Sequence, residues 1–163
     1  MEISLLPLEE KHRVPVIDIF NYYIENTFAA FPENPLPYAA FDLFMSKSQG
    51  YPRVVAVDET GTVVGFGLLH PFNPFPTFAH VVEITCFLKP SCTGQKIGGR
   101  IRAHLEAEAK QRGISTILAG ISSLNSVSLR YHEQAGFVRR GELVGVCRKQ
   151  GKEFDLVWMQ KLL

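Results

Sequence analysis

The sequence predicts an α/β fold in which a mixed β-sheet carries helices on both faces. Predicted strands and helices interleave along the chain in the order βααβββαβαββ, and interleaving of this kind is typical of layered α/β domains. The stretch from Val81 to Gly113 reads as an apolar strand, a glycine-rich loop and an amphipathic helix in succession. The chain has 163 residues, 46% of them hydrophobic, which is enough to bury one substantial core. We therefore expect one domain over residues 1–163.

The first half of the chain is predicted to form a strand, two helices and a β-hairpin. Pro7 ends the first strand, and Pro15 suits the first turn of a helix. The predicted elements are a strand at Glu2–Leu6, a helix from about Pro15 to Thr27, a helix from Pro37 or Tyr38 to about Gln49, and strands at Arg53–Asp58 and Val63–Leu69. Between the helices, the proline-rich loop Phe28–Pro37 is either a lid over a pocket or a buried connection.

The second half is predicted to contain four strands and two helices. A second proline-punctuated aromatic loop, Pro71–Phe78, leads into the apolar strand. Gly113 and Gly136 are suitable C-caps for the two helices. The predicted elements are strands at Val81–Leu88, Thr116–Ile121, Phe137–Val146 and Phe154–Leu162, with helices from Ile97 to Gly113 and from Asn125 or Ser126 to Ala135.

The glycine loop that precedes the helix at Ile97 indicates a phosphate site. Free amides in a helix's first turn attract anions, and glycines let a ligand approach the backbone. Gly94 and Gly99 have the separation of a Walker loop, but Arg100-Ile101 follow in place of Lys-Ser/Thr, so nucleotide hydrolysis is not expected. The GxGxxG fingerprint of dinucleotide sites is missing as well. The sequence predicts a different phosphate-bearing cofactor.

Composition and residue pattern exclude several other classes of protein. A formal net charge of +1 gives no electrostatic reason to expect nucleic acid or an anionic membrane as partner. Cys86, Cys92 and Cys147 cannot all pair, which favours reduced thiols in a cytoplasm. The N-terminus does not look like a signal peptide, and no apolar run is long enough to span a bilayer. His104 and Glu108, one helical turn apart, are interpreted as a solvated pair, so no metal is expected.

Two motifs resemble those of the GCN5-related N-acetyltransferases (GNAT superfamily). The family's coenzyme A loop reads Gln or Arg, two residues, Gly, one residue, Gly or Ala. Here Gly98 matches, whereas Thr93 and Lys96 stand where Gln or Arg and the first glycine are usual. The segment NSVSLRYHEQAGF, from Asn125 to Phe137, is similar to the second family signature. The element order also resembles that of the family.

Three further stretches are similar to the phosphinothricin and methionine-sulfone N-acetyltransferases in particular. They are NYYIENT in the first helix, the strand start Val82-Glu83-Ile84-Thr85, and GKEFDLVWMQ from Gly151 to Gln160. The resemblance runs along nearly the whole chain. It implies the GNAT acyl-CoA N-acyltransferase fold, a central mixed, mostly antiparallel, twisted sheet of about seven strands flanked by about four helices.

The resemblance implies acetyl-CoA as the cofactor and assigns residues to it. The phosphates would lie against the loop, and the pantetheine arm would pair with strand backbone like an added strand. Asn125 would contact that arm and could equally be a helix cap. Lys96, Arg100 and Arg102 could flank the phosphates, although a solvated helix face is an equal reading for Arg102. The expected cofactor-binding residues are Cys86, Phe87, Leu88, Thr93, Gly94, Gln95, Lys96, Ile97, Gly98, Gly99 and Asn125.

Acetyl transfer to an amine needs a base for the amine and a proton for the departing thiolate. Glu83 stands where the subfamily has its acid and is the expected general base; the alternative is a solvated or ion-paired carboxylate. His132 stands where many members have tyrosine and this subfamily commonly histidine. It is either the general acid or a ring satisfied by a helix carbonyl. Tyr131 and the Cys86 thiol are expected to pack in the core.

The substrate is expected to be a small primary amine or amino-acid analogue, such as a methionine sulfone or sulfoximine or a phosphinothricin-like compound. Its pocket would be lined by aromatic side chains of the two loops and the last hairpin, chiefly Phe28, Phe31, Phe72 and Phe78, with Phe75 nearby. Alternatives are an idle acyl-CoA-binding module and a protein N-terminal or lysine acetyltransferase. The resemblance also implies a homodimer.

Overall fold

The structure is a computed structural model that describes residues 1–163. Seven strands and four α-helices follow one another in the predicted order, which confirms the predicted fold class. In chain order they are β1 (Ser4–Pro7), α1 (Arg13–Asn26), α2 (Phe41–Lys47), β2 (Arg53–Val57), β3 (Val63–Pro71), β4 (Val81–Leu88), α3 (Ile97–Gln111), β5 (Thr116–Ser122), α4 (Ser126–Gln134), β6 (Val138–Lys149) and β7 (Lys152–Leu162).

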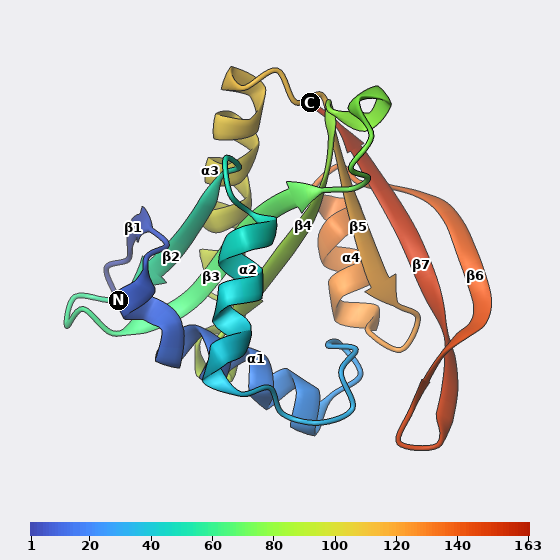
Figure 1. Ribbon diagram of the computed structural model, residues 1–163. Coiled ribbons are helices and arrows are strands. Elements are labelled where there is room, and N and C mark those ends of the chain that lie inside the picture. The colour runs from blue at the N-terminus through green and yellow to red at the C-terminus, as the bar shows by residue number, and fades with distance from the viewer.

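All seven strands form one sheet, in the order β1-β2-β3-β4-β5-β7-β6 (Figure 1). Every neighbouring pair is antiparallel except β4 and β5, which are parallel. The parallel pair arises because α3 carries the chain from the end of β4 back to the start of β5. The sheet is therefore mixed and mostly antiparallel, as predicted.

Helices cover both faces of the sheet. In the view of Figure 1, α1 and α2 lie in front of it, and α3 and α4 lie behind. Side chains that alternate along β2 and β3 supply one buried cluster to each face. On the α3 face, the helix buries the apolar residues that its four-residue spacing predicts, and each of them is at most 2% exposed: Ile97, Ile101, Leu105 and Ala109.

The observed boundaries differ from the predicted ones mainly at the last hairpin. β6 and β7 extend to Lys149 and Lys152, beyond the predicted strand ends, because the connecting turn has only two residues. Gln150 and Gly151 both have positive φ, 51° and 73°, as a two-residue hairpin turn requires. The second helix is shorter than predicted, because Tyr38–Ala40 forms a 3-10 turn before it. None of the helices has the length and apolar character needed to cross a membrane.

Candidate active site

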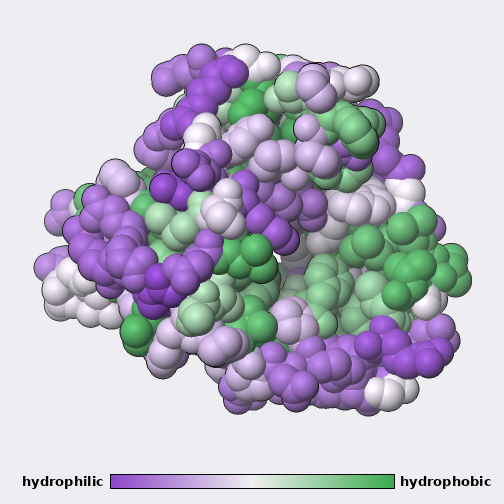
Figure 2. Space-filling view, in the orientation of Figure 1, coloured by the Kyte–Doolittle hydropathy of each residue, from purple (hydrophilic) through white to green (hydrophobic).

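The central feature of the sheet is the point where the two parallel strands separate. β4 pairs with β5 only from Val81 to Glu83, opposite Thr116 to Leu118. Beyond Glu83, the rest of β4 pairs with β3 alone, and the rest of β5 pairs with β7 alone. Figure 1 shows the two strands diverging, with α4 visible between them. In Figure 2, the same orientation shows a hollow near the middle of the surface, with hydrophobic residues on its right-hand rim.

Backbone groups of β4 that pair with no neighbouring strand line this gap. In the antiparallel pair with β3, the Lys89 amide donates to the Val64 carbonyl at 2.8 Å. Alternation along the strand then turns the amide and carbonyl of Cys86 away from β3, into the gap, together with the carbonyl of Leu88. That carbonyl accepts a hydrogen bond from the Tyr23 hydroxyl at 2.7 Å. The expected pairing surface therefore exists at Cys86 and Leu88.

The backbone of Phe87 points the other way. Phe87 lies opposite Phe66 of β3 in the ladder, so its own amide and carbonyl face that strand. Its ring packs at centroid distances of 5.1 Å against both Phe20 and Tyr23. Of the three β4 residues expected at the cofactor, Phe87 is thus the one whose backbone does not face the gap.

The glycine loop lies at the N-terminus of α3, beside the gap. None of the amides of residues 94–99 donates a hydrogen bond within the protein, so they form a row of free donors at the positive end of the helix. Gly94 has φ +76° and Lys96 has φ +64°. The left-handed backbone at Lys96 explains why glycine is usual at this position. The geometry suits a phosphate group.

The remaining loop residues shape this row of donors. Ile97 is 2% exposed and anchors the start of α3 in the core. The Thr93 hydroxyl donates to the Pro90 carbonyl at 2.9 Å, and the Gln95 side-chain amide donates to the Ser91 carbonyl at 3.2 Å. Both side chains therefore stabilise the conformation of the loop through hydrogen bonds to the preceding turn.

Of the three nearby basic residues, Lys96 is the one whose side chain has neither a hydrogen bond nor an ion pair within the protein. The Arg100 guanidinium donates to the Ile3 carbonyl at 2.9 Å. Arg102 is mostly buried and pairs with Glu106, which also accepts from Lys161 at 3.0 Å. The solvated helix face considered for Arg102 is therefore wrong, because its side chain is only 16% exposed.

The Tyr131 hydroxyl is buried and has no hydrogen-bond partner, and the same is true of the Nε atom of Arg102. A Cβ added to Gly98 would lie 3.7 Å from that hydroxyl and 3.7 Å from Leu88. Tyr131 therefore lies between the glycine loop and the open edge of β4. Burial raises the pKa of Tyr131, so the hydroxyl keeps its proton. An unpartnered buried donor costs about 1–3 kcal/mol, and a ligand carrying an acceptor would satisfy it. Sequence analysis predicted that Tyr131 packs in the core and did not identify its hydroxyl as a candidate ligand-binding group.

The two candidate site residues near α4, Asn125 and His132, are held by hydrogen bonds to the helix. The Asn125 side chain accepts from the Ser128 amide at 3.2 Å, which confirms the predicted cap. His132 Nδ1 lies 2.8 Å from the Ser128 carbonyl; because a carbonyl only accepts, Nδ1 carries the proton. The ring also packs edge-on against Phe137 at 4.9 Å. Burial lowers the pKa of His132. The imidazole is thus neutral near pH 7, with a free lone pair on Nε2.

Glu83 is the last residue at which β4 and β5 pair, and its side chain is 29% exposed. Burial raises the pKa of this carboxyl, against the opposing effects of His70 and Lys47. His70 lies directly opposite Glu83 on β3, with Nε2 4.0 Å from Oε2. Sequence reasoning missed His70 because the predicted strand ended at Leu69. Register counting across the β3/β4 pair would have found it.

The Cys86 thiol is not a nucleophile. Burial raises the pKa of this thiol to about 12, so it stays protonated at neutral pH. Its side chain packs against the core cluster on the α3 face. The predicted packing role of Cys86 agrees with this position.

The aromatic residues predicted to bind substrate converge on one face of β7. Phe28 packs on Phe154 at 5.5 Å. Phe72 contacts Phe78 at 6.0 Å and Trp158 at 5.8 Å. Phe154 and Trp158 share a face of β7, and the register carries that face through Leu118 and Gln160 to Glu83. Phe31 and Phe75 are more exposed, at 44% and 67%. Phe31 lines a hollow of about 270 Å³ beside Phe154.

Lys149 holds the first aromatic loop against the last hairpin. It lies between the two last predicted strands, but in the structure it ends β6 and is 1% exposed. Its ammonium donates to the carbonyls of Ile24, Thr27 and Ala30 at 2.7, 2.9 and 2.7 Å. These carbonyls belong to the end of α1 and the loop that follows. The loop is therefore an anchored part of the fold.

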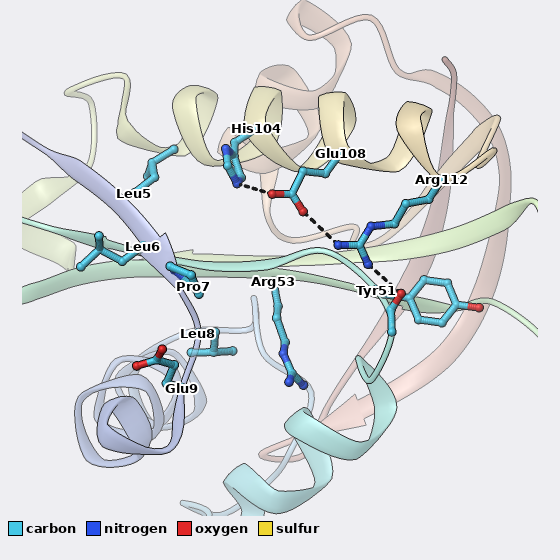
Figure 3. A pocket seen from close by; sticks show the side chains of 11 residues that line it. Leu5, Leu6, Pro7, Leu8, Glu9, Tyr51, Arg53, His104, Glu108 and Arg112 are labelled. Carbon is cyan, nitrogen blue, oxygen red and sulfur yellow. Dashed lines mark hydrogen bonds and ion pairs between the residues drawn. The ribbon is translucent and has the colours of Figure 1, made fainter.

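A second hollow, of about 560 Å³, lies elsewhere, between β1, the end of α2 and the outer side of α3 (Figure 3). His104 Nε2 and Glu108 Oε1 are 2.9 Å apart there, at 40% and 36% exposure, and Arg112 donates to the Gly50 carbonyl. The predicted solvated pair agrees with this geometry. No three His, Cys, Asp or Glu side chains gather anywhere to hold a metal ion. This groove contains none of the chemistry found at Glu83.

Comparison with known proteins explains the gap and the glycine loop together. Residues 16–137 match the model of the acetyltransferase (GNAT) family. The chain belongs to this family. As a GNAT enzyme it is an acetyl-CoA-dependent N-acetyltransferase.

Individual relatives are similar along nearly the whole chain. The L-methionine sulfoximine/L-methionine sulfone acetyltransferase of Pseudomonas paraeruginosa is 30% identical, over 89% of this chain and 86% of its own. A GNAT phosphinothricin acetyltransferase from Sinorhizobium meliloti, solved with acetyl-CoA, superposes with a TM-score of 0.93 at 27% identity, covering 100% of this chain and 89% of that one. A ribosomal-protein-alanine N-acetyltransferase from Brucella melitensis has a TM-score of 0.92 and 31% identity, covering 98% and 99%.

Proposed function

We propose that this N-acetyltransferase moves the acetyl group of acetyl-CoA to the primary amine of a small amino-acid analogue, by direct attack with Glu83 as the general base. One observation carries the proposal: a partly buried carboxylate stands where β4 and β5 part, on the face lined by the aromatic side chains. The names of the sulfoximine, sulfone and phosphinothricin acetyltransferases support the amino-acid-analogue class.

Residues already described fit acetyl-CoA, which supplies an activated thioester carbonyl when it is bound. The free amides of residues 94–99 would hold its diphosphate. The backbone of Cys86 and Leu88 would pair with the pantetheine arm, and the unpartnered Tyr131 hydroxyl and the Asn125 side chain would contact polar groups of the same arm. The chain can bind and align this co-substrate without a metal ligand.

The chemistry of the chain centres on two proton movements. An amine attacks only as the free base, and Glu83 accepts the ammonium proton. Because burial raises the pKa of Glu83, its carboxylate is a stronger base than an exposed one. His132 first takes a proton from water on Nε2 and then gives that proton to the departing sulfur, while its Nδ1–H bond to Ser128 fixes the ring orientation.

The pocket favours an acceptor with an apolar part. Phe72, Phe78 and Trp158 form one aromatic wall, and Phe28 with Phe154 forms another. Burying a substrate carboxylate without a cation is costly. Lys47 is the permanently charged cation whose charge acts on Glu83, and a doubly acidic substrate such as phosphinothricin needs more than one.

The test is release of free coenzyme A over a panel of amino acids, sulfones, sulfoximines and polyamines. We expect turnover with a small amine, and a kcat/KM for Glu83→Gln lowered by about 10²–10⁴-fold, the usual contribution of a general base, with unchanged acetyl-CoA affinity. In the wild type, the rate should fall as pH falls through the raised pKa of Glu83. Full activity of Glu83→Gln at every pH would refute the assignment, and binding without turnover on any amine would favour an idle acyl-CoA module.

A protein substrate is the second candidate, favoured by the likeness to a ribosomal-protein-alanine N-acetyltransferase at 31% identity. Peptides that begin with alanine therefore belong in the same panel. A kcat/KM higher for these peptides than for every free amino acid would favour the protein acceptor.

We place this enzyme in the cytoplasm as one domain over residues 1–163 that assembles as a homodimer. All seven strands belong to one sheet, and its three cysteines are free thiols, which suits a reducing compartment. The edge strand β6 exposes four apolar side chains, which support pairing there: Val138, Leu143, Val144 and Val146.

A further inference from the structure

His70 and Glu83 form a pair that the acetyl-transfer scheme has not yet used. They are directly opposite each other in the antiparallel β3/β4 ladder, which brings side chains on the same face close together. Nε2 of His70 lies 4.0 Å from Oε2 of Glu83, and their side chains are 20% and 29% exposed. The pair is therefore shielded on one side and reachable by water on the other.

The other ring nitrogen of His70 fixes the tautomer. Nδ1 lies 3.2 Å from the carbonyl of Pro71, and because that oxygen can only accept, Nδ1 is the protonated nitrogen in the neutral ring. Nε2 then carries the lone pair and faces the carboxyl of Glu83. The 4.0 Å separation exceeds a hydrogen bond of about 2.8 Å, so proton transfer requires the two side chains to approach each other. The neutral ring is thus oriented to accept a proton from Glu83.

Few other charged groups influence this pair. In the same row of the sheet, β5 contributes Leu118 and β7 contributes Gln160, neither of which titrates. From the helices, Lys47 at the end of α2 is the group whose charge acts on Glu83. His70 is therefore the one nearby group that can both receive a proton from Glu83 and release it to water.

We propose that His70 relays the substrate proton from Glu83 to solvent. The inference rests on the proposed function of Glu83. An N–H bond of the ammonium breaks as an O–H bond forms on Glu83; that O–H bond then breaks as an N–H bond forms on His70 Nε2, and the imidazolium gives the proton to water. Glu83 returns to its carboxylate form for the next turnover. His70 acts through Glu83 and does not touch the substrate.

Two variants of His70 test the relay in the full-length enzyme. His70→Asn keeps an amide donor for the Pro71 carbonyl but cannot take a proton. His70→Ala leaves room for imidazole from the buffer. We expect kcat to fall about 10²-fold in both, the low end of acid–base contributions, with unchanged acetyl-CoA affinity. Added imidazole should restore the rate of His70→Ala.

The matched controls are His80→Asn and His80→Ala, at an exposed histidine ten residues away. Both should have the kcat of the wild type, and added imidazole should not change it. A wild-type rate for His70→Asn would overturn the relay, as would a slow His70→Ala that imidazole does not restore. Glu83→Gln, assayed alongside, distinguishes a failure of the His70 relay from a failure of Glu83 as the general base. If it is slow while His70→Asn is not, only the relay fails; if it is fully active, the proposed base fails too.

Discussion

At the scale of single residues, Lys96 has a backbone conformation that its side chain disfavours. Its φ of +64° lies in the left-handed region, which costs an L-residue about 1–2 kcal/mol. Lys96→Gly removes that cost and adds about 0.4–1 kcal/mol of chain freedom to the unfolded state. We expect the free energy of unfolding, measured in urea, to rise by about 0.5–1 kcal/mol. Lys96→Ala, which keeps the Cβ, should leave stability nearly unchanged, and an equal gain in both variants would contradict the strain.

His132 gives a second prediction at the residue scale. As a proton donor it must be protonated, and burial lowers the pKa of its imidazole below 6.5. The kcat of the wild type should therefore fall as pH rises through that lowered pKa, and His132→Ala should lower kcat at least about tenfold and abolish the fall. If His132→Ala reduces only the free energy of unfolding and the pH profile keeps its shape, the residue serves packing against Phe137.

At the scale of elements, Lys149 joins α1, the first aromatic loop and β6. Its three hydrogen bonds end on the carbonyls of Ile24, Thr27 and Ala30. Lys149→Met would leave these carbonyls buried without a donor, and we expect the free energy of unfolding to drop by about 2–4 kcal/mol. The exposed Lys110→Met should change it by less than about 0.5 kcal/mol. Similar losses in both variants would show that the anchor contributes nothing specific.

The point at which β4 and β5 stop pairing could not be predicted from the residue pattern of either strand. Apolar runs placed both strands within one or two residues of their observed ends, because propensity and proline positions are local signals. Where two distant strands stop pairing depends on register and on the helices packed behind them, which no local pattern contains. The open edge at Cys86 and Leu88 came from family resemblance, and only the three-dimensional ladder separates these residues from Phe87.

At the scale of the whole molecule, the edge strand β6 predicts the assembly state. Val144 is 81% exposed on a strand with one free edge, and such edges tend to pair. Light scattering after gel filtration should give twice the 18.3 kDa chain mass. Val144→Asp should shift the protein toward the monomer, whereas Val127→Asp, at an exposed valine of α4, should not. A monomeric wild type would contradict the proposed homodimer.

The site was predictable from the sequence to the extent that its residues lie in contiguous motifs. The glycine loop and Glu83 stand within one stretch of chain, so their proximity follows from local order. His70 and Lys149 contact partners on other elements, and the position of the Tyr131 hydroxyl beside the glycine loop follows from the packing of separate elements. A lysine near a predicted turn reads as solvated, yet Lys149 is buried by carbonyls more than a hundred residues away. Such pairings need the folded structure.

A crystal structure with acetyl-CoA tests the central claim most directly. The account predicts the diphosphate against the amides of residues 94–99, the pantetheine arm along Cys86 and Leu88 in the gap between β4 and β5, and the acetyl group beside the Glu83 carboxylate. A coenzyme bound elsewhere with this gap empty, or a Glu83 side chain turned away from the acetyl group, would contradict it.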